Sequence, residues 1–237
     1  MKKLIIISIF AFLGANQVFA QGYYQKQFTS DLFILDEYIK RQNKGIDFKD
    51  TKSYTGTPYN HPSYLTGNVY RNNELLATNV ALRYNAIADE MEIKESITSS
   101  DDDAKVLTKS PDIFVKIMDD IFVFVPYQGG VEGGGYFEVL YEGKKVDLFK
   151  KHVKSFSKGK KATSSITRDV PAKFVDKPVY YLVMKNGKFY ELPSSRNKKI
   201  KVFGEHQDLM KDYVKDNDLD LNDEEDLRKA VLFFDGN

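Results

Sequence analysis

Residues 178–192 read PVYYLVMKNGKFYEL, and this stretch decides the fold class. The run Pro178–Met184 is rich in β-branched and aromatic side chains, which pleated strands favour. Asn186-Gly187 separates it from a second such run, Lys188–Leu192. Asn-Gly between two apolar runs predicts a β-hairpin with a type I′ turn, because both turn residues must adopt positive φ. The sequence therefore predicts two antiparallel strands joined by a tight turn.

Short apolar runs of the same kind recur upstream. The expected strands are Thr66–Arg71, Leu75–Tyr84, Glu90–Glu95, Lys105–Lys109, Ile113–Ile117, Ile121–Tyr127, Tyr136–Tyr141 and Lys145–Phe156. Asn72-Asn73, Asp119-Asp120 and Glu142-Gly143 supply turns between them. Connections this short join antiparallel neighbours, which predicts a meander. Because Ile121–Val125 and Val179–Met184 are apolar on both faces, we expect a covered sheet, as a sandwich or a partly open barrel.

The C-terminal residues change from the strand period to the helical period. Apolar side chains line one face of Glu205–Lys215 and one face of Asp223–Phe234, which predicts two amphipathic helices. Asn222 followed by Glu225 forms a capping box at the start of the second helix. Helices this short need tertiary packing. The prediction is a mainly β fold, with an antiparallel β domain over residues 64–203 and a packed helical pair over residues 204–237.

Residues 21–63 precede the predicted sheet. Asp31–Lys40 fits a short helix or a strand, because its apolar residues suit both periods. Thr51–Ser63 contains a glycine, two prolines and two tyrosines. The breakers exclude a regular element and the tyrosines offer large surfaces to bury, which predicts an ordered loop.

Residues 1–20 have the three parts of a secretory signal peptide. Met1-Lys2-Lys3 is positively charged, Leu4–Leu13 is an apolar run too short to span a bilayer, and Val18-Phe19-Ala20 fits a cleavage site. We therefore expect an exported protein, periplasmic or extracellular. The chain has no cysteine, so we expect no lipid anchor, disulfide or thiolate metal site. No later apolar run is long enough for a transmembrane helix.

No motif in the sequence indicates a recognisable chemistry. The glycine cluster Gly129–Gly135 precedes a strand, so it lacks the helix N-terminus that holds phosphates. Asp216–Asn222 resembles a calcium loop, but Leu221 and Leu227 occupy the glycine and glutamate positions. The histidines stand in separate segments: His61, His152 and His206. We therefore predict no catalytic, cofactor-binding or metal-binding residues.

Charge is distributed unevenly along the chain. Residues 21–143 carry 12 basic and 19 acidic side chains, residues 144–201 carry 17 and 4, and residues 205–237 carry 4 and 11. The candidate site for a polyanion or a protein partner consists of eight lysines: Lys144, Lys145, Lys150, Lys151, Lys154, Lys158, Lys160 and Lys161. Phe156 among them offers a stacking surface. Either these lysines neutralise the acidic ends and protect an edge strand, or they form one exposed face for an anionic partner.

Several segments are similar to exported, β-rich proteins of Bacteroidota that have no assigned activity. They are Gly56–Tyr59, Leu65–Tyr70, Val80–Asn85, Asp89–Glu92, Tyr136–Tyr141 and Asp223–Leu227. The resemblance covers most of the mature chain, and its motifs carry no chemistry. One exported protein of similar size from that phylum is the periplasmic plug of the type nine secretion translocon. The resemblance therefore offers a plug or accessory subunit as an alternative function.

Together these observations predict a non-catalytic exported protein that binds a protein or a cell-envelope component. The expected partner is an envelope or secretion-machinery protein, or an anionic envelope polymer. Nucleic acid is not expected outside the cytoplasm. The second alternative is an exported hydrolase whose site no linear motif reveals.

The export prediction can be tested on protein purified from its natural host. We expect mass spectrometry to give an N-terminus at Gln21, or its cyclised form, because signal peptidase cleaves after small residues at the −3 and −1 positions. An intact Met1 on most of the protein would contradict it.

Overall fold

The structure is a computed structural model, and it describes residues 54–126, 134–164 and 166–237. Its strands are β1 (Tyr54–Thr55), β2 (Leu65–Arg71), β3 (Glu74–Asn85), β4 (Glu90–Lys94), β5 (Lys105–Val106), β6 (Ile113–Ile117), β7 (Asp120–Val125), β8 (Gly135–Glu142), β9 (Val146–Lys151), β10 (Lys154–Ser157), β11 (Ala172–Asp176), β12 (Val179–Met184) and β13 (Phe189–Leu192). Its α-helices are α2 (Arg196–Val202), α3 (Gln207–Asp216) and α4 (Glu224–Gly236). The predicted signal peptide, the Asp31–Lys40 element and most of the glycine cluster lie outside the described residues.

Ten strands form one antiparallel sheet in the order β13-β12-β9-β8-β7-β6-β2-β3-β4-β5. The predicted antiparallel, mainly β fold is therefore confirmed. The meander is interrupted twice, because β6 pairs with β2 and not with β5, and β9 pairs with β12 and not with β10. β5 has only two residues, and the chain after it returns to the turn between β2 and β3, where the Asn72 amide donates to the Asp112 carbonyl.

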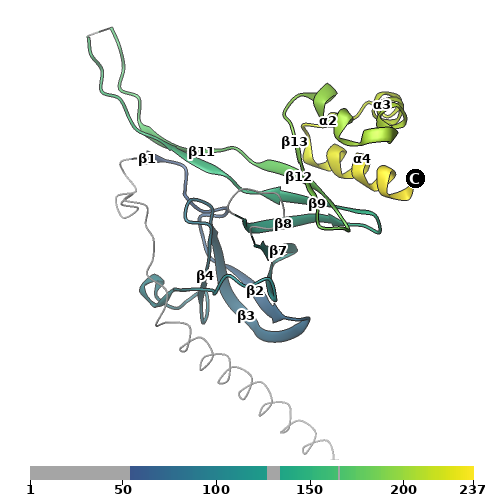
Figure 1. Cartoon of the computed structure of the whole chain (residues 1–237). Coiled ribbons are helices and arrows are strands. Elements are labelled where there is room, and N and C mark those ends of the chain that lie inside the picture. Colours follow the sequence, from purple (N-terminus) through teal and green to yellow (C-terminus); the bar gives the residue numbers. More distant parts are fainter. Residues whose placement is uncertain (1–53, 127–133, 165) are drawn as a thin grey trace, which may run out of the picture.

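The sheet curls without closing, and its side chains belong to two separate cores. Tyr84 on β3 contacts Phe122 on β7 and Tyr136 on β8, although β2 and β6 lie between β3 and β7 in the sheet. These rings belong to a first core inside the curl. Leu148 of β9 and Leu182 of β12 belong to a second core, which the helices cover (Figure 1).

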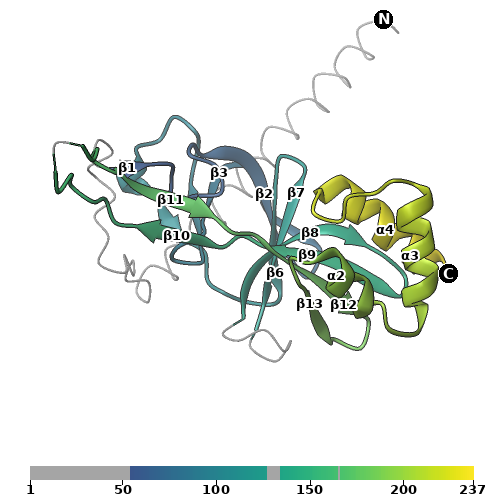
Figure 2. The ribbon, with the colours of Figure 1, turned by 90° about the horizontal axis from the view of Figure 1, so that it is seen from above.

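A two-stranded arm projects from the body at the side away from the helices (Figures 1 and 2). The predicted single strand Lys145–Phe156 breaks at His152-Val153, so β9 stays in the large sheet and β10 enters a three-stranded sheet of order β1-β11-β10. β10 and β11 are antiparallel, whereas β1 and β11 are parallel. Since β11 leads into β12, the arm continues the β9–β12 pair.

The hairpin at Asn186-Gly187 joins β12 and β13 as predicted, but the predicted turn type is wrong. Gly187 has φ +80°, Asn186 has no positive φ, and the Gly187 amide donates to the Met184 carbonyl. This is a three-residue turn with a glycine bulge. Tyr180 therefore pairs with Leu192, which places Leu192 in the core beneath the helices. A two-residue turn would shift the register by one and turn Leu192 to the opposite face.

The two predicted C-terminal helices are present as α3 and α4. Helix α2 was not predicted, because its basic run contains only two apolar residues. Ile200 of α2 and Phe203 after it are buried with Met210 and Val231 of the later helices. No helix in the described part of the chain is long and apolar enough to cross a membrane.

The carboxylate of Asp235 attaches α4 to the turn between β8 and β9. It accepts hydrogen bonds from the backbone amides of Lys144, Lys145 and Val146 at 2.9, 2.7 and 3.0 Å, and from the Tyr141 hydroxyl at 3.0 Å. A Cβ at Gly143 would collide with this carboxylate, so the close approach requires glycine. Burial alone would raise the pKa of Asp235, but these four donors outweigh it and hold the pKa well below its usual range.

We predict that Asp235→Asn lowers the free energy of unfolding by about 2–4 kcal/mol at pH 7, because buried donors lose a charged acceptor. Since the folded pKa is depressed, this contribution is present above the unfolded pKa of about 4 and disappears only as the pH falls through the lower folded value. Urea unfolding at pH 7, 5 and 3 measures the difference. The exposed Asp212→Asn is the control, with an expected change below about 0.5 kcal/mol. Equal effects of both substitutions would contradict the role of Asp235.

Candidate functional site: a basic hairpin arm

A binding face made of all eight candidate lysines requires them to lie on one exposed side, and they do not. Three of them are largely buried in ion pairs, with side-chain exposures of 16% for Lys150, 15% for Lys151 and 6% for Lys154. Lys150 Nζ lies 2.7 Å from Glu224 Oε2 at the start of α4. Lys154 Nζ lies 2.8 Å from Asp176 Oδ1 across the β10–β11 pair. These three lysines therefore neutralise carboxylates within the fold.

Lys151 takes part in the contact that holds the curl of the sheet. Its Nζ lies 2.7 Å from Oδ1 of Asp89, in the turn between β3 and β4. The same oxygen accepts hydrogen bonds from the Tyr84 hydroxyl at 2.6 Å and the Tyr136 amide at 3.1 Å. A Cβ at Gly135 would collide with both charged groups. One carboxylate thus connects β3, β8 and β9.

The five remaining candidate lysines are exposed, and they form two groups at opposite ends of one ribbon. Lys144 and Lys145 lie in the turn before β9, beside Asp235. Lys158, Lys160 and Lys161 follow β10 on the arm. No ion pair among the described residues involves these three. The arm therefore carries three of the five exposed candidate charges, and the turn before β9 carries the other two.

The return strand adds basic residues that the sequence analysis did not include. Lys160 and Val170 exchange both backbone hydrogen bonds at 2.8 Å, which aligns the two sides of the arm beyond the regular strands. Arg168 and Lys173 are exposed on the returning side. Residues 158–171 carry four basic and one acidic side chain. This side of the arm could have been recognised in the sequence from residues 172–176, whose pattern fits a strand that returns along the lysine-rich strand as a hairpin.

An aromatic cluster holds the base of the arm. The Tyr54 ring lies edge-on to Phe174 at a centroid distance of 5.1 Å, and Phe174 packs on Phe156 at 5.0 Å. Phe156 is therefore engaged in this cluster and does not serve as the free stacking surface that we expected. Tyr54 belongs to β1, so the segment before β2 braces the arm.

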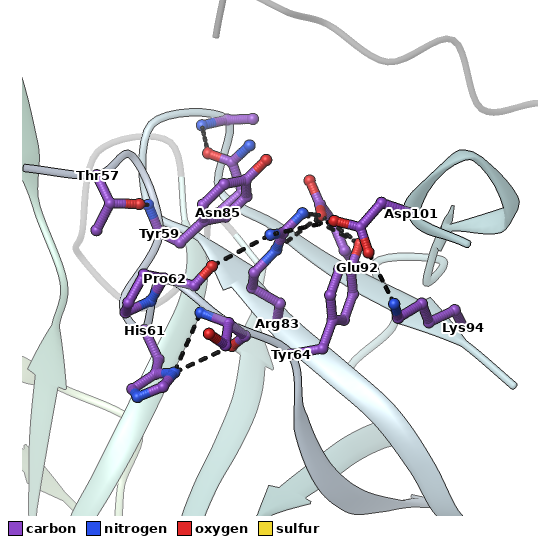
Figure 3. A network of polar contacts seen from close by, with 12 residues as sticks. Thr57, Tyr59, His61, Pro62, Tyr64, Arg83, Asn85, Glu92, Lys94 and Asp101 are labelled. Atoms are coloured by element: carbon purple, nitrogen blue, oxygen red, sulfur yellow. Dashed lines mark hydrogen bonds and ion pairs between the residues drawn. The ribbon is translucent and has the colours of Figure 1, made fainter. Parts of the chain in front are cut away.

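Of the predicted ordered loop, residues 54–63 are described; Tyr54–Thr55 forms the short strand β1, which was not predicted, and the network shown in Figure 3 anchors the residues after it. The guanidinium of Arg83 on β3 lies 3.7 Å from the ring centroid of Tyr59 and 4.0 Å from that of Tyr64. Glu92 on β4 accepts from Arg83 Nη2 and from the Tyr64 hydroxyl, both at 2.8 Å. The stack fixes the loop that leads from β1 to β2, and so joins the arm's brace to the first core.

The three histidines stay apart in the fold: His61 Nδ1 lies 3.0 Å from the Ser63 carbonyl oxygen, and the His206 ring packs on Phe234. His152 Nε2 lies 2.5 Å from Glu138 Oε2, with its ring against Phe122 and Tyr84. Burial alone would raise the pKa of Glu138, but His152 and Lys150 outweigh it and lower the pKa. No group of three metal-ligating side chains occurs among the described residues.

The calcium-like loop between α3 and α4 already contains a cation from the chain itself. Lys199 Nζ donates to the Leu221 carbonyl at 2.6 Å and to Asn222 Oδ1 at 3.0 Å. Burial lowers the pKa of Lys199. An ammonium group, and not a bound metal ion, therefore satisfies these two oxygens.

The chain was compared with protein-family models, with curated proteins and with solved structures, and none of the three comparisons finds a match. The resemblance to exported Bacteroidota proteins therefore stays a prediction.

We predict that Lys151→Met lowers the free energy of unfolding by about 2 kcal/mol, because it leaves the Asp89 carboxylate without its nearest cation. Lys158→Met on the arm is the matched control and should change it by less than about 0.5 kcal/mol. Urea unfolding measures both, and Asp89→Asn completes a double-mutant cycle with Lys151→Met. Equal effects of the two lysine substitutions, or additivity in the cycle, would show that the pair does not hold the curl.

Proposed function

We propose that the protein is a non-catalytic exported binding protein whose basic arm engages an anionic component of the cell envelope. The observation that carries this proposal is the division among the lysines. Lys150 and Lys151 are paired in the body and Lys154 is paired with Asp176 at the base of the arm, whereas Lys158, Lys160 and Lys161 project on the arm without a carboxylate partner among the described residues.

The placement of these charges supports binding. If the basic region only neutralised the acidic ends of the chain, all of its lysines would be expected near carboxylates. The arm instead carries its charge away from the acidic helices, at the opposite end of the molecule (Figure 2). Charge that projects into solvent attracts a polyanion over distances up to the Debye length, about 8 Å at physiological salt.

The bracing of the arm supports the same proposal. β1 and the Tyr54–Phe156–Phe174 cluster order the base of the arm before any partner arrives. A pre-ordered surface loses less conformational entropy on binding, which favours affinity.

The proposal predicts the behaviour of two charge-matched triple variants on immobilised heparin, used as a generic polyanion. Lys158→Gln with Lys160→Gln and Lys161→Gln should elute at lower salt than the parent, and the log–log salt slope should fall by up to about three, because three contacts no longer release counterions. Lys144→Gln with Lys145→Gln and Lys188→Gln removes the same charge from exposed turns at the other end of the ribbon. This control should elute close to the parent.

If the two triple variants were retained equally, the loss of retention would depend on net charge and not on the position of the lysines, which would contradict the proposal. Both variants should keep the parent's melting temperature within about 2 °C, since the substitutions are exposed. Circular dichroism at the column temperature verifies that each variant is folded.

A further inference from the structure

Hydrogen bonds among the described residues at the end of the arm hold a turn in which Ile166 presents a large apolar side chain. The Thr167 amide donates to the Ser164 carbonyl at 3.2 Å, and the Thr163 and Ser164 amides both donate to Thr167 Oγ1 at 3.1 Å. Ile166 lies inside this turn and is 92% exposed. Turn corners favour glycine, asparagine, aspartate and serine, so turn formation does not explain an isoleucine here.

Three basic side chains and one acidic side chain lie near this apolar corner, and the acidic one, Asp169, accepts from the Ala162 amide at 2.6 Å. Arg168 is two residues away, and Lys160 and Lys161 lie on the opposite side of the same ribbon. Val170 beside them is 53% exposed. The arm extends over about ten residues from Lys154 to the turn, which corresponds to a reach of roughly 30 Å at the rise of a β-strand. The apolar corner is therefore presented away from the body (Figure 1).

We infer that the arm docks on the surface of an anionic lipid layer, with Ile166 inserted among the acyl chains and the surrounding basic side chains on the headgroup phosphates. This inference rests on the proposed function and names its ligand class. A soluble polysaccharide would use the positive charges alone and leave Ile166 in water. A lipid layer presents negative charge at its surface and hydrocarbon directly beneath it, in the order that the tip requires.

The order of the apolar and basic side chains along the arm also agrees with a lipid surface. Ile166 lies beyond the Lys160–Val170 bridge along the ribbon, and Lys158 and Lys160 stand further back along it. Lysine and arginine stems can remain in the apolar region while their charged ends reach the phosphates. Each basic side chain near an anionic surface adds to the attraction, and this part weakens as salt rises.

The experiment uses the absence of tryptophan from the chain. Ile166→Trp introduces the chain's only tryptophan near the end of the arm, and Ile97→Trp places one at another exposed isoleucine, 53% exposed, in the body. Each variant of the mature protein is titrated with vesicles of phosphatidylcholine containing 30 mol% phosphatidylglycerol, as a general anionic surface, or with phosphatidylcholine alone. We expect a blue-shifted emission and quenching by brominated acyl chains only for Ile166→Trp, only with the anionic vesicles, and weakening with salt.

A second variant separates insertion from electrostatic attraction without a tryptophan. Ile166→Ser should lower partition onto the anionic vesicles by about three- to tenfold in a sedimentation assay, since it removes the inserted apolar group, and should leave heparin retention unchanged. Ile97→Ser should leave both unchanged. The lipid inference would be overturned if heparin retention were full while Ile166→Trp gave no emission shift, or while the two serine variants partitioned equally onto the vesicles. Polyanion binding would then remain intact, which would favour a polymer or an acidic protein as the partner. If the arm lysines prove irrelevant to heparin retention, the proposed function itself fails.

Discussion

The carboxylate of Asp89 is the contact on which the rest of the structure depends. A ten-stranded open sheet has two edges and no closing ladder, so its curl needs a long-range attachment. Asp89 supplies it, by accepting from Tyr84 on its own side and from Tyr136 and Lys151 on the far side. Asp89 has φ +56°, a conformation that aspartate tolerates better than most residues. In this conformation its carboxylate faces Tyr136 and Lys151. The first core is enclosed because this attachment exists.

Holding the curl also sets the direction of the arm. Lys151 is the last residue of β9, and the ribbon leaves the large sheet immediately after it, at His152-Val153. The β9–β12 pair therefore has one end fixed by Asp89 and the other fixed by Asp235 at the turn beneath α4. With both ends of this pair attached, the core sets the direction in which the arm leaves the large sheet.

Much of the fold was predictable from local pattern, and the exceptions depend on tertiary contacts. Antiparallel hairpins and the two amphipathic helices follow from residue periods and turn chemistry, and they are present. The turn at Asn186-Gly187 differs because burial of Leu192 beneath the helices sets the strand register and overrides the local preference for a two-residue turn. The strand break at His152 is invisible in sequence for a related reason, since the pattern of Lys145–Phe156 is continuous while its two halves pair in different sheets.

The candidate site shows the corresponding limit for charge. A run of lysines predicts a positively charged surface, but whether each lysine is paired depends on which carboxylates the fold brings near it. Asp89 and Glu224 are 62 and 74 residues away in sequence from the lysines that they pair with. Once those pairs are removed from the run, the exposed lysines that remain are Lys144 and Lys145 at the turn before β9, and Lys158, Lys160 and Lys161 on the arm with Ile166. The physical difference between the two groups of lysines is desolvation. A buried ammonium is costly without a partner, so the body supplies carboxylates, whereas the arm keeps its ammonium groups hydrated and able to exchange water for an external anion.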